Sequence, residues 1–370
     1  MITLNRPYRI STKVVAPADT LYDRKITWLY SSREGLNMIY QHLYKERGSL
    51  CVAVSPLTCF VALYPIVNNG HTIRFVDINP LTFNIDEDKL TKLNDIDVVQ
   101  LIYLGGNPIA MDKILPWLKA NNVIIVEDCA QALGSTYQGL PVGTFGDYAV
   151  YSSVKNLYAV AGGFMLSDQT ITSETISNVH PVVYIYKRIK HWIESKTNAK
   201  NCNLWNTIYK TLLKISGQGS LNGTKIHTLH PTMINKNRIL LAQAERIQSV
   251  RIKNANKLIS LIDKDKYIIQ QEIEDAVSCR NRIIILSKNR LAKELINDLR
   301  ETGIAANNLT QSYLSAYQKA VFEDGQLSKY YSTHLDVYES LLPRLLSIPS
   351  SPALTDQEIV YIVNQVNKLG

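Results

Sequence analysis

The chain has 370 residues, of which 46% are hydrophobic, so we expect a globular protein with room for two cores. Its first residues lack an apolar run, and no window approaches about eighteen uncharged apolar residues, so we expect neither a secretory signal nor a transmembrane helix. Five cysteines without CxxC spacing indicate neither a disulfide framework nor a metal site, and they favour a reducing cytoplasm.

The net charge of +8 is concentrated in one segment. Residues 180–225 contain eight Lys or Arg and a single acid, which gives +7 there and leaves +1 for the rest of the chain. A nucleic-acid-binding face would spread its charge more widely, and none of the usual nucleic-acid motifs is present. We therefore expect no nucleic-acid partner.

The first predicted helix follows an extended lead-in and begins near Ser31 and Ser32. Apolar residues recur at helical spacing as far as Tyr44, and Glu34 close behind the serine pair is typical of a helix start. Backbone N–H groups at a helix start can bind a phosphate, although an ordinary cap without a ligand has the same pattern.

The next elements alternate between strand and helix. Apolar runs at residues 50–55, 72–77 and 97–104 predict strands, and residues 58–67 predict a helix between the first two. This alternation predicts right-handed crossovers and a mostly parallel sheet.

Two later strands each deliver a charged residue. A β-branched run at 123–126 is followed by Glu127 and Asp128, and an apolar run at 148–151 is followed shortly by Lys155. Ligands of open α/β sheets collect at the carboxyl ends of the strands, so a carboxylate and a lysine are expected to meet there. Pyridoxal phosphate needs such an amine to form a Schiff base and such an acid to keep its pyridine nitrogen protonated.

Residues 170–230 form a basic insert with two predicted amphipathic helices, at 182–193 and 204–213. In one interpretation, residues 180–220 contact anionic lipid at the inner membrane face or a diphosphate-bearing substrate. In the other, they form a helical hairpin that packs on its own domain or on a dimer mate and leaves a solvated basic face.

The carboxyl-terminal part has a different pattern. A long helix is predicted over residues 240–262, and charged helices then alternate with short strands such as 283–286. Thr355 and Glu358 form a predicted capping box before a last helix over 359–369. The change of pattern predicts two domains, a large one over 1–248 and a small α+β one over 249–370.

Three motifs together resemble the DegT/DnrJ/StrS-type sugar aminotransferases. They are Glu127-Asp128-Cys129-Ala130-Gln131-Ala132, Gly143-Thr144-Phe145-Gly146-Asp147, and Lys155-Asn156 followed by Gly162-Gly163. The resemblance runs from about Trp28 to Leu369, apart from the basic insert. It implies an α/β fold of type I, with a mostly parallel central sheet covered by helices on both faces and a smaller carboxyl-terminal α+β domain, and it implies pyridoxal phosphate as the cofactor.

The resemblance assigns the cofactor contacts near the two strand ends. Lys155 would be the Schiff-base lysine, Asp128 the partner of the pyridinium nitrogen, and Gln131 a hydrogen-bond donor on the side of the ring hydroxyl. Ser152 would bind the phosphate, because Val150 stands where the family commonly has a serine for that purpose.

Further contacts are implied along the chain. Ser32 and Arg33 occupy the family's phosphate-binding helix start. Cys59 stands where the family stacks a side chain on the ring, although Phe60 could take that place and Cys59 could be a buried core residue. Two residues, Asn237 and Arg238, match an element that reaches the cofactor phosphate of the partner subunit, and the alternative for them is an ordinary solvated helix start.

The resemblance implies an aminotransferase that moves an amino group from an amino acid, usually glutamate, to a keto group of a nucleotide-linked sugar for polysaccharide or related glycan synthesis. We expect a cytoplasmic homodimer with a shared active site. One alternative is a sugar dehydratase, in which the family replaces the lysine with histidine. The other is a non-catalytic, membrane-associated cofactor-binding protein, suggested by Val150 and by Ala161, which stands where the family has a glutamate.

Overall fold

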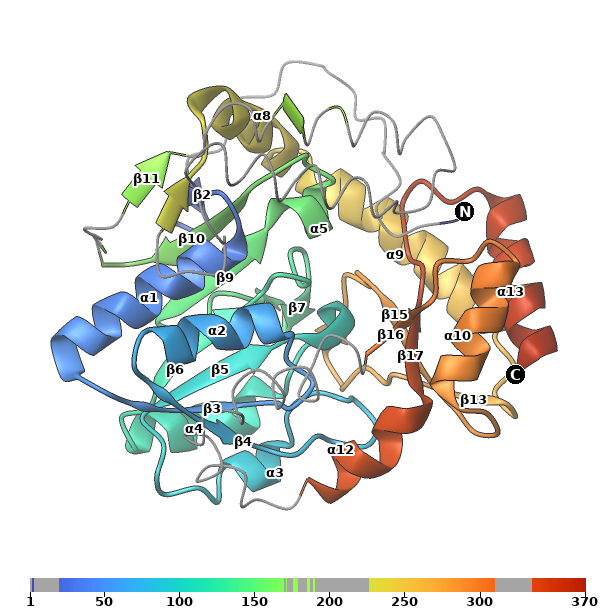
Figure 1. The fold of residues 1–370 in the computed structure, drawn as a ribbon, viewed down its shortest axis with the longest axis horizontal. Coiled ribbons are helices and arrows are strands. Elements are labelled where there is room, and N and C mark those ends of the chain that lie inside the picture. The colour runs from blue at the N-terminus through green and yellow to red at the C-terminus, as the bar shows by residue number, and fades with distance from the viewer. Residues whose placement is uncertain are drawn as a thin grey trace.

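The computed structural model describes residue 2, residues 20–169, 226–309 and 335–370, and a few positions between 171 and 189. A ten-stranded mixed sheet forms its centre (Figure 1), with the main strand order β11-β12-β2-β10-β9-β6-β5-β3-β4. No helix in the described ranges is long and apolar enough to cross a membrane.

Five neighbouring strands of this sheet are parallel. They are β3 (Cys51–Val54), β4 (Thr72–Phe75), β5 (Val98–Ile102), β6 (Ile124–Asp128) and β9 (Tyr148–Ser152). Each overlaps a predicted strand, and three of them are buried along nearly their whole length, as strands covered on both faces must be.

The other half of the sheet departs from the predicted parallel pattern. Strand β10 (Gly163–Ser167) is antiparallel to both β9 and β2 (Arg24–Leu29). The edge beyond β2 is made by β1 (Thr20–Leu21), β12 (Ile226–Thr228) and β11 (Ile176–Asn178). The predicted α/β class is confirmed, and the central sheet is mixed because β10 returns directly alongside β9 instead of crossing over.

Helices cover both faces of the sheet. The helices of this part are α1 (Ser32–Arg47), α2 (Phe60–Asn68), α3 (Glu87–Leu90), α4 (Met111–Ala120), α5 (Ser153–Leu157) and α8 (Pro231–Leu241), with a short 3-10 turn η1 (Leu104–Gly106). Side chains alternate along β3, so Val52 and Val54 pack in one core with α1 and α2, whereas Ala53 packs in a second core with α4.

The carboxyl-terminal part is built on a four-stranded antiparallel sheet. Its strands are β13 (Tyr267–Ile269), β15 (Ile283–Ser287), β16 (Asn307–Asn308) and β17 (Leu345–Ile348). A separate core joins it to helices α9 (Ala244–Leu261), α10 (Ala292–Glu301) and α13 (Asp356–Leu369). The remaining elements are α12 (Asp336–Leu341), η3 (Leu342–Arg344) and a small sheet of β14 (Ala276–Val277), β7 (Thr136–Tyr137) and β8 (Leu140–Pro141).

The break between α8 and α9 and the start of α13 bear on two of the sequence predictions. The helix predicted over 240–262 is wrong in extent, because α8 ends at Leu241 and α9 begins at Ala244. The capping box of Thr355 and Glu358 is confirmed at the start of α13.

The domain boundary and the structure of the basic insert remain predictions. The domain boundary at residue 248 remains a prediction, and it falls inside the continuous helix α9. The predicted helices of the basic insert lie almost entirely outside the described residues.

Candidate active site

Lys155 and Asp128 lie at the same edge of the sheet. Asp128 is the last residue of β6 and pairs with Val150 of the parallel strand β9, which ends where the short helix α5 begins. Both side chains line one cavity, together with residues from α1, α2 and the 128–131 turn. The cavity is partly open to solvent. The predicted meeting of an amine and a carboxylate is therefore present in the fold.

The two groups influence each other's ionisation. Burial lowers the pKa of Lys155 and the nearby Arg282 guanidinium lowers it further, while Cys59 and Asp128 act in the opposite direction. Burial raises the pKa of Asp128, opposed by Lys155 and by a hydrogen bond from the Ala130 N–H at 3.1 Å. A lysine with a lowered pKa keeps part of its population neutral closer to physiological pH, as a nucleophilic amine requires.

The start of helix α1 forms another wall of the cavity. Ser32 and Arg33 line it, and their contact with a phosphate remains a prediction. The N-cap residue Ser31 does not cap the helix with its side chain, because its hydroxyl donates to the Glu34 carboxylate instead. The Ser31 side chain therefore does not compete with an anion for the backbone N–H groups at this helix start.

Gly163 explains how α1 can begin so close to the site. A Cβ on Gly163 would lie 2.3 Å from the Ser32 backbone nitrogen and 2.5 Å from the Ser31 carbonyl carbon. Only glycine therefore lets β10 and the start of α1 approach this closely. The Gly-Gly pair of the sequence motif sets the position of the helix start.

Gln131 and Cys59 also face the cavity. The Gln131 Oε1 accepts a hydrogen bond from the Gly105 N–H at 3.2 Å, which leaves the amide NH₂ as the donor end of the side chain. The predicted role of Gln131 as a donor is compatible with this orientation. Phe60 is not among the lining residues, and its ring contacts Tyr64 with centroids 5.6 Å apart.

Three predicted cofactor residues do not line the cavity. The Ser152 hydroxyl accepts a bond from the Lys155 N–H at 3.4 Å and so caps α5. Asn237 is fully buried in α8, donates to the Ala161 carbonyl at 3.1 Å and packs against Gly162. Arg238 follows it in the same helix. Their roles toward a cofactor, including a contact across a dimer, remain predictions.

Glu127 is a central residue of the site's framework that sequence reasoning left without a role. Its buried carboxylate accepts hydrogen bonds from the Tyr103 hydroxyl at 2.5 Å and from the N–H groups of Gly143, Phe145 and Gly146 at 2.7–2.8 Å. Burial raises the pKa of Glu127, and these four donors oppose the rise. Tyr103 both donates to Glu127 and lines the cavity.

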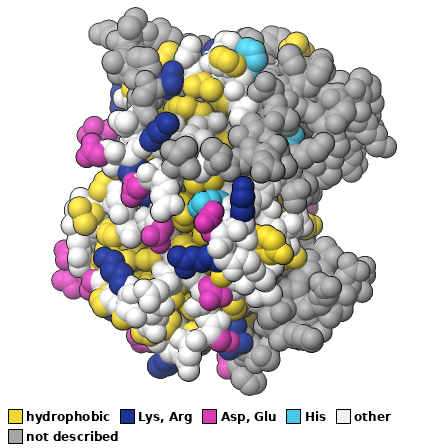
Figure 2. All heavy atoms as spheres, turned by 90° about the vertical axis from the view of Figure 1, so that its left-hand side faces the viewer, with side chains coloured by type: hydrophobic (Ala, Val, Ile, Leu, Met, Phe, Trp, Pro, Cys, Tyr) yellow, Lys and Arg dark blue, Asp and Glu magenta, His cyan; other side chains and the backbone are white. Residues whose placement is uncertain are grey.

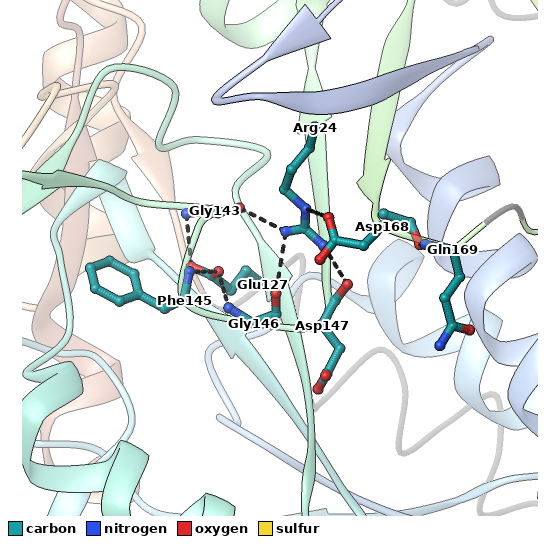
Figure 3. A network of polar contacts seen from close by, with 9 residues as sticks. Arg24, Glu127, Gly143, Phe145, Gly146, Asp147, Asp168 and Gln169 are labelled. Atoms are coloured by element: carbon teal, nitrogen blue, oxygen red, sulfur yellow. Dashed lines mark hydrogen bonds and ion pairs between the residues drawn. The ribbon is translucent and has the colours of Figure 1, made fainter.

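The same loop is held from its other side by Arg24 (Figure 3). The Arg24 guanidinium donates to the carbonyls of Gly143 at 3.3 Å, Gly146 at 3.2 Å and Asp147 at 2.5 Å. The second sequence motif, residues 143–147, therefore serves as a braced loop behind β6. No local signal near Arg24 indicates this contact, which spans more than a hundred positions in the chain.

Comparison with known proteins places this geometry in context. The sequence model described as the DegT/DnrJ/EryC1/StrS aminotransferase family matches residues 29–367. A GDP-perosamine synthase from Escherichia coli O157:H7 is 24% identical over 325 residues, which cover 86% of this chain and 78% of the relative.

Solved structures share the fold. A sugar aminotransferase from Micromonospora echinospora superposes with a TM-score of 0.68 at 19% identity, covering 93% of this chain and 87% of the other. A GDP-4-keto-6-deoxy-D-mannose-3-dehydratase from E. coli with bound hydrated PLP gives a TM-score of 0.67 at 20% identity, with coverage of 93% and 87%. At these identities the likeness shows the fold alone.

Proposed function

The chain belongs to the DegT/DnrJ/EryC1/StrS aminotransferase family, and from that premise we propose that it transfers an amino group from an amino acid to a keto group of a nucleotide-linked sugar. The observation that carries this proposal is the meeting of Lys155 and Asp128 in one cavity at the carboxyl ends of neighbouring parallel strands. The nucleotide-linked sugar is supported by the relative named for GDP-perosamine.

The residues of the cavity fit pyridoxal phosphate. Lys155 offers the amine, Asp128 offers a carboxylate opposite it, and the start of α1 offers N–H groups at Ser32 and Arg33 for a phosphate. When bound, this cofactor supplies an electron sink for the bonds around the substrate's amine-bearing carbon. The donor set thus matches each of the cofactor's three polar regions.

The chain's own residues have separable tasks in the proposed reaction. Burial lowers the pKa of Lys155, which makes its amine a better candidate to accept and return a proton. The carboxylate of Asp128 provides the negative charge that stabilises a cation within the cavity. The Gln131 amide, held by Gly105, offers a fixed donor.

The partners follow from the same proposal. Glutamate is the proposed amino donor, and a second copy of the chain is proposed to complete the site through Arg238, because Asn237 is buried within its own chain. The compartment is proposed to be the cytoplasm. Contact of residues 180–220 with a membrane stays a prediction about residues that lie largely outside the described ranges.

A two-step assay tests this function. The purified chain with added pyridoxal phosphate should show the absorbance band of a lysine-bound cofactor, glutamate should bleach the band, and a keto sugar nucleotide should restore it. Lys155→Ala should show no such band, whereas Lys293→Ala, which removes an exposed lysine, should behave as the parent. A band that no amino donor bleaches would favour the non-catalytic alternative, and loss of a sugar hydroxyl without amination would favour the dehydratase.

A further inference from the structure

We propose that Arg251 is a positioning residue that holds Lys155 in place through its main chain. The proposal rests on the role of Lys155 in the proposed function. Arg251 lies in α9, and among the described residues it is one of the largest side chains that are completely buried. A buried guanidinium is costly to desolvate, so its surroundings show what it binds.

The contacts of Arg251 converge on the helix that carries Lys155. One guanidinium nitrogen, Nη2, donates to the Lys155 carbonyl at 3.3 Å and to the Asn156 carbonyl at 3.1 Å. The Asn281 amide adds a second bond to the Lys155 carbonyl at 3.0 Å. Two side chains from the carboxyl-terminal part of the chain therefore bind the backbone carbonyl of the proposed catalytic lysine.

Helix α5 needs such partners because it is short. It spans only Ser153–Leu157, and the last four carbonyls of any helix have no partner within that helix. A helix of this length is also unstable by itself. Arg251 and Asn281 provide the missing donors, and they thereby fix the part of the backbone from which the Lys155 side chain projects.

The charge of Arg251 is balanced by neutral acceptors. Its Nη1 donates to the Gln248 Oε1 at 2.7 Å and its Nε to the Tyr158 hydroxyl at 3.3 Å, and its guanidinium lies 5.2 Å from the Tyr158 ring centroid. Within the described part of the chain, no carboxylate forms an ion pair with it. The carbonyls of α5 are therefore among the main groups that stabilise this cation, and charge-assisted bonds of this kind are stronger than neutral ones.

The planar fork of arginine is what this arrangement uses. A lysine at position 251 keeps the charge but offers a single nitrogen, so it cannot reach the two carbonyls, Gln248 and Tyr158 together. A methionine fills a similar volume and donates nothing. Arg246 lies on the exposed face of the same helix and provides a matched control.

The test compares Arg251→Met, Arg251→Lys, Asn281→Ala and Arg246→Gln in the full-length chain. Peptide mass spectrometry measures how the labelling of Lys155 by an amine-reactive reagent depends on pH, without added cofactor. In a second experiment, kcat/KM for glutamate is measured with the cofactor present. In Arg251→Met we expect the pH of half-maximal Lys155 labelling to rise toward that of an ordinary lysine, because a loosened α5 lets water reach the amine. We expect kcat/KM to fall by about 10- to 100-fold, since small misplacements of a reacting group have effects of this order.

The other variants should shift the pH of half-maximal labelling less than Arg251→Met does. Arg251→Lys and Asn281→Ala are expected to show intermediate shifts in this pH, and Arg246→Gln should match the parent. A folded Arg251→Met chain with an unchanged labelling profile would overturn the proposal. If Arg251→Met does not fold, the other two variants decide by the same criterion.

Failure of the proposed function has a different signature. In that case the parent chain shows no response to amino donors, while the labelling profiles still report whether Arg251 positions Lys155.

Discussion

Glu127 and Asp128 are adjacent buried carboxylates with different surroundings. Successive side chains of a strand point to opposite faces, so β6 directs Asp128 into the cavity and Glu127 toward Tyr103 and the 143–147 loop. Burial raises the pKa of both groups, but only Asp128 has Lys155 as a counter-charge. Strand β6 thus supplies two acids with different roles. Asp128 faces the cavity, and Glu127 holds the 143–147 loop.

Glu127→Gln tests whether Glu127 stabilises the fold through its hydrogen bonds to Tyr103 and the 143–147 loop. An amide replaces one acceptor oxygen with a donor, so two of the four donors around Glu127 lose their partner. We expect the free energy of unfolding to fall by about 2–4 kcal/mol, because each buried donor left unpaired costs about 1–3 kcal/mol. Urea unfolding measures this loss.

The control for that substitution is Glu274→Gln, whose side chain is exposed. It should leave the urea midpoint unchanged. Equal midpoints for Glu127→Gln and the parent would contradict the assignment of Glu127 to the framework.

Gly163→Ala tests the close approach of β10 to the start of α1. The new Cβ must displace the backbone at Ser31 and Ser32, and forced overpacking of this kind typically costs about 1–3 kcal/mol. Displacement of the helix start should also weaken cofactor binding by roughly an order of magnitude, since it moves the N–H groups assigned to the phosphate. Thermal unfolding and a spectrophotometric titration with pyridoxal phosphate measure the two effects.

Gly139→Ala separates steric clash from backbone strain. Gly139 has a φ of +75° but no atom within 4 Å of an added Cβ, so only local strain is introduced there. Its cofactor affinity should equal that of the parent. Parent-like affinity in Gly163→Ala would show that the helix start does not bind the phosphate.

At the scale of elements, Asp77 fastens α12 to the edge of the large sheet. Its buried carboxylate accepts bonds from the N–H groups of Val337 at 3.0 Å and Tyr338 at 2.9 Å, and from the Lys89 ammonium at 2.7 Å. Burial by itself would raise the pKa of Asp77, but Lys89 and the backbone N–H groups outweigh it and lower the pKa.

Asp77→Asn is therefore expected to destabilise the protein by about 2–4 kcal/mol at neutral pH, since it removes a buried charged acceptor. A group whose pKa is lowered by folding stabilises above its ordinary value of 3.8 and loses this contribution as pH falls through its folded pKa. The difference in free energy of unfolding between parent and variant should accordingly become smaller below about pH 4.

Unfolding experiments across pH check the Asp77 prediction. Asp88→Asn, exposed on the neighbouring α3, should leave the midpoint unchanged at every pH. A difference that stays constant down to strongly acidic pH would contradict the ionised, hydrogen-bonded state of Asp77.

The elements also show which features a sequence can predict. The strand ends at Asp128 and Lys155 were predictable because a buried apolar run followed by a charged residue is a local signal. The break between α8 and α9 was not, because Leu241–Ala244 contains neither glycine nor proline. The contacts of Arg251 and Asn281 with Lys155 join residues 96 and 126 positions apart, and nothing in either neighbourhood indicates them.

At the scale of the whole molecule, the prediction of an aminotransferase with fold type I is confirmed by the family and by the fold. The space-filling view shows mixed Lys, Arg, Asp and Glu side chains on one face of the described residues (Figure 2). This mixture agrees with the sequence, in which most of the net charge belongs to residues 180–225.

Mixing two inactive variants tests the proposed dimer. Lys155→Ala removes the amine, and Arg238→Ala removes the group proposed to reach the partner's cofactor. If sites are shared, a mixed dimer has one site with both changes and one intact site, so random mixing should restore up to about a quarter of the parent activity. Activity that stays at the level of the separate variants would contradict a shared site.

We propose above all that one lysine, Lys155, holds the cofactor. Borohydride reduction of the chain with pyridoxal phosphate, followed by peptide mass spectrometry, tests it most directly. We predict stoichiometric modification of the peptide that contains Lys155 and no comparable modification in Lys155→Ala. Modification spread over several surface lysines, or an equal yield in Lys155→Ala, would contradict the claim.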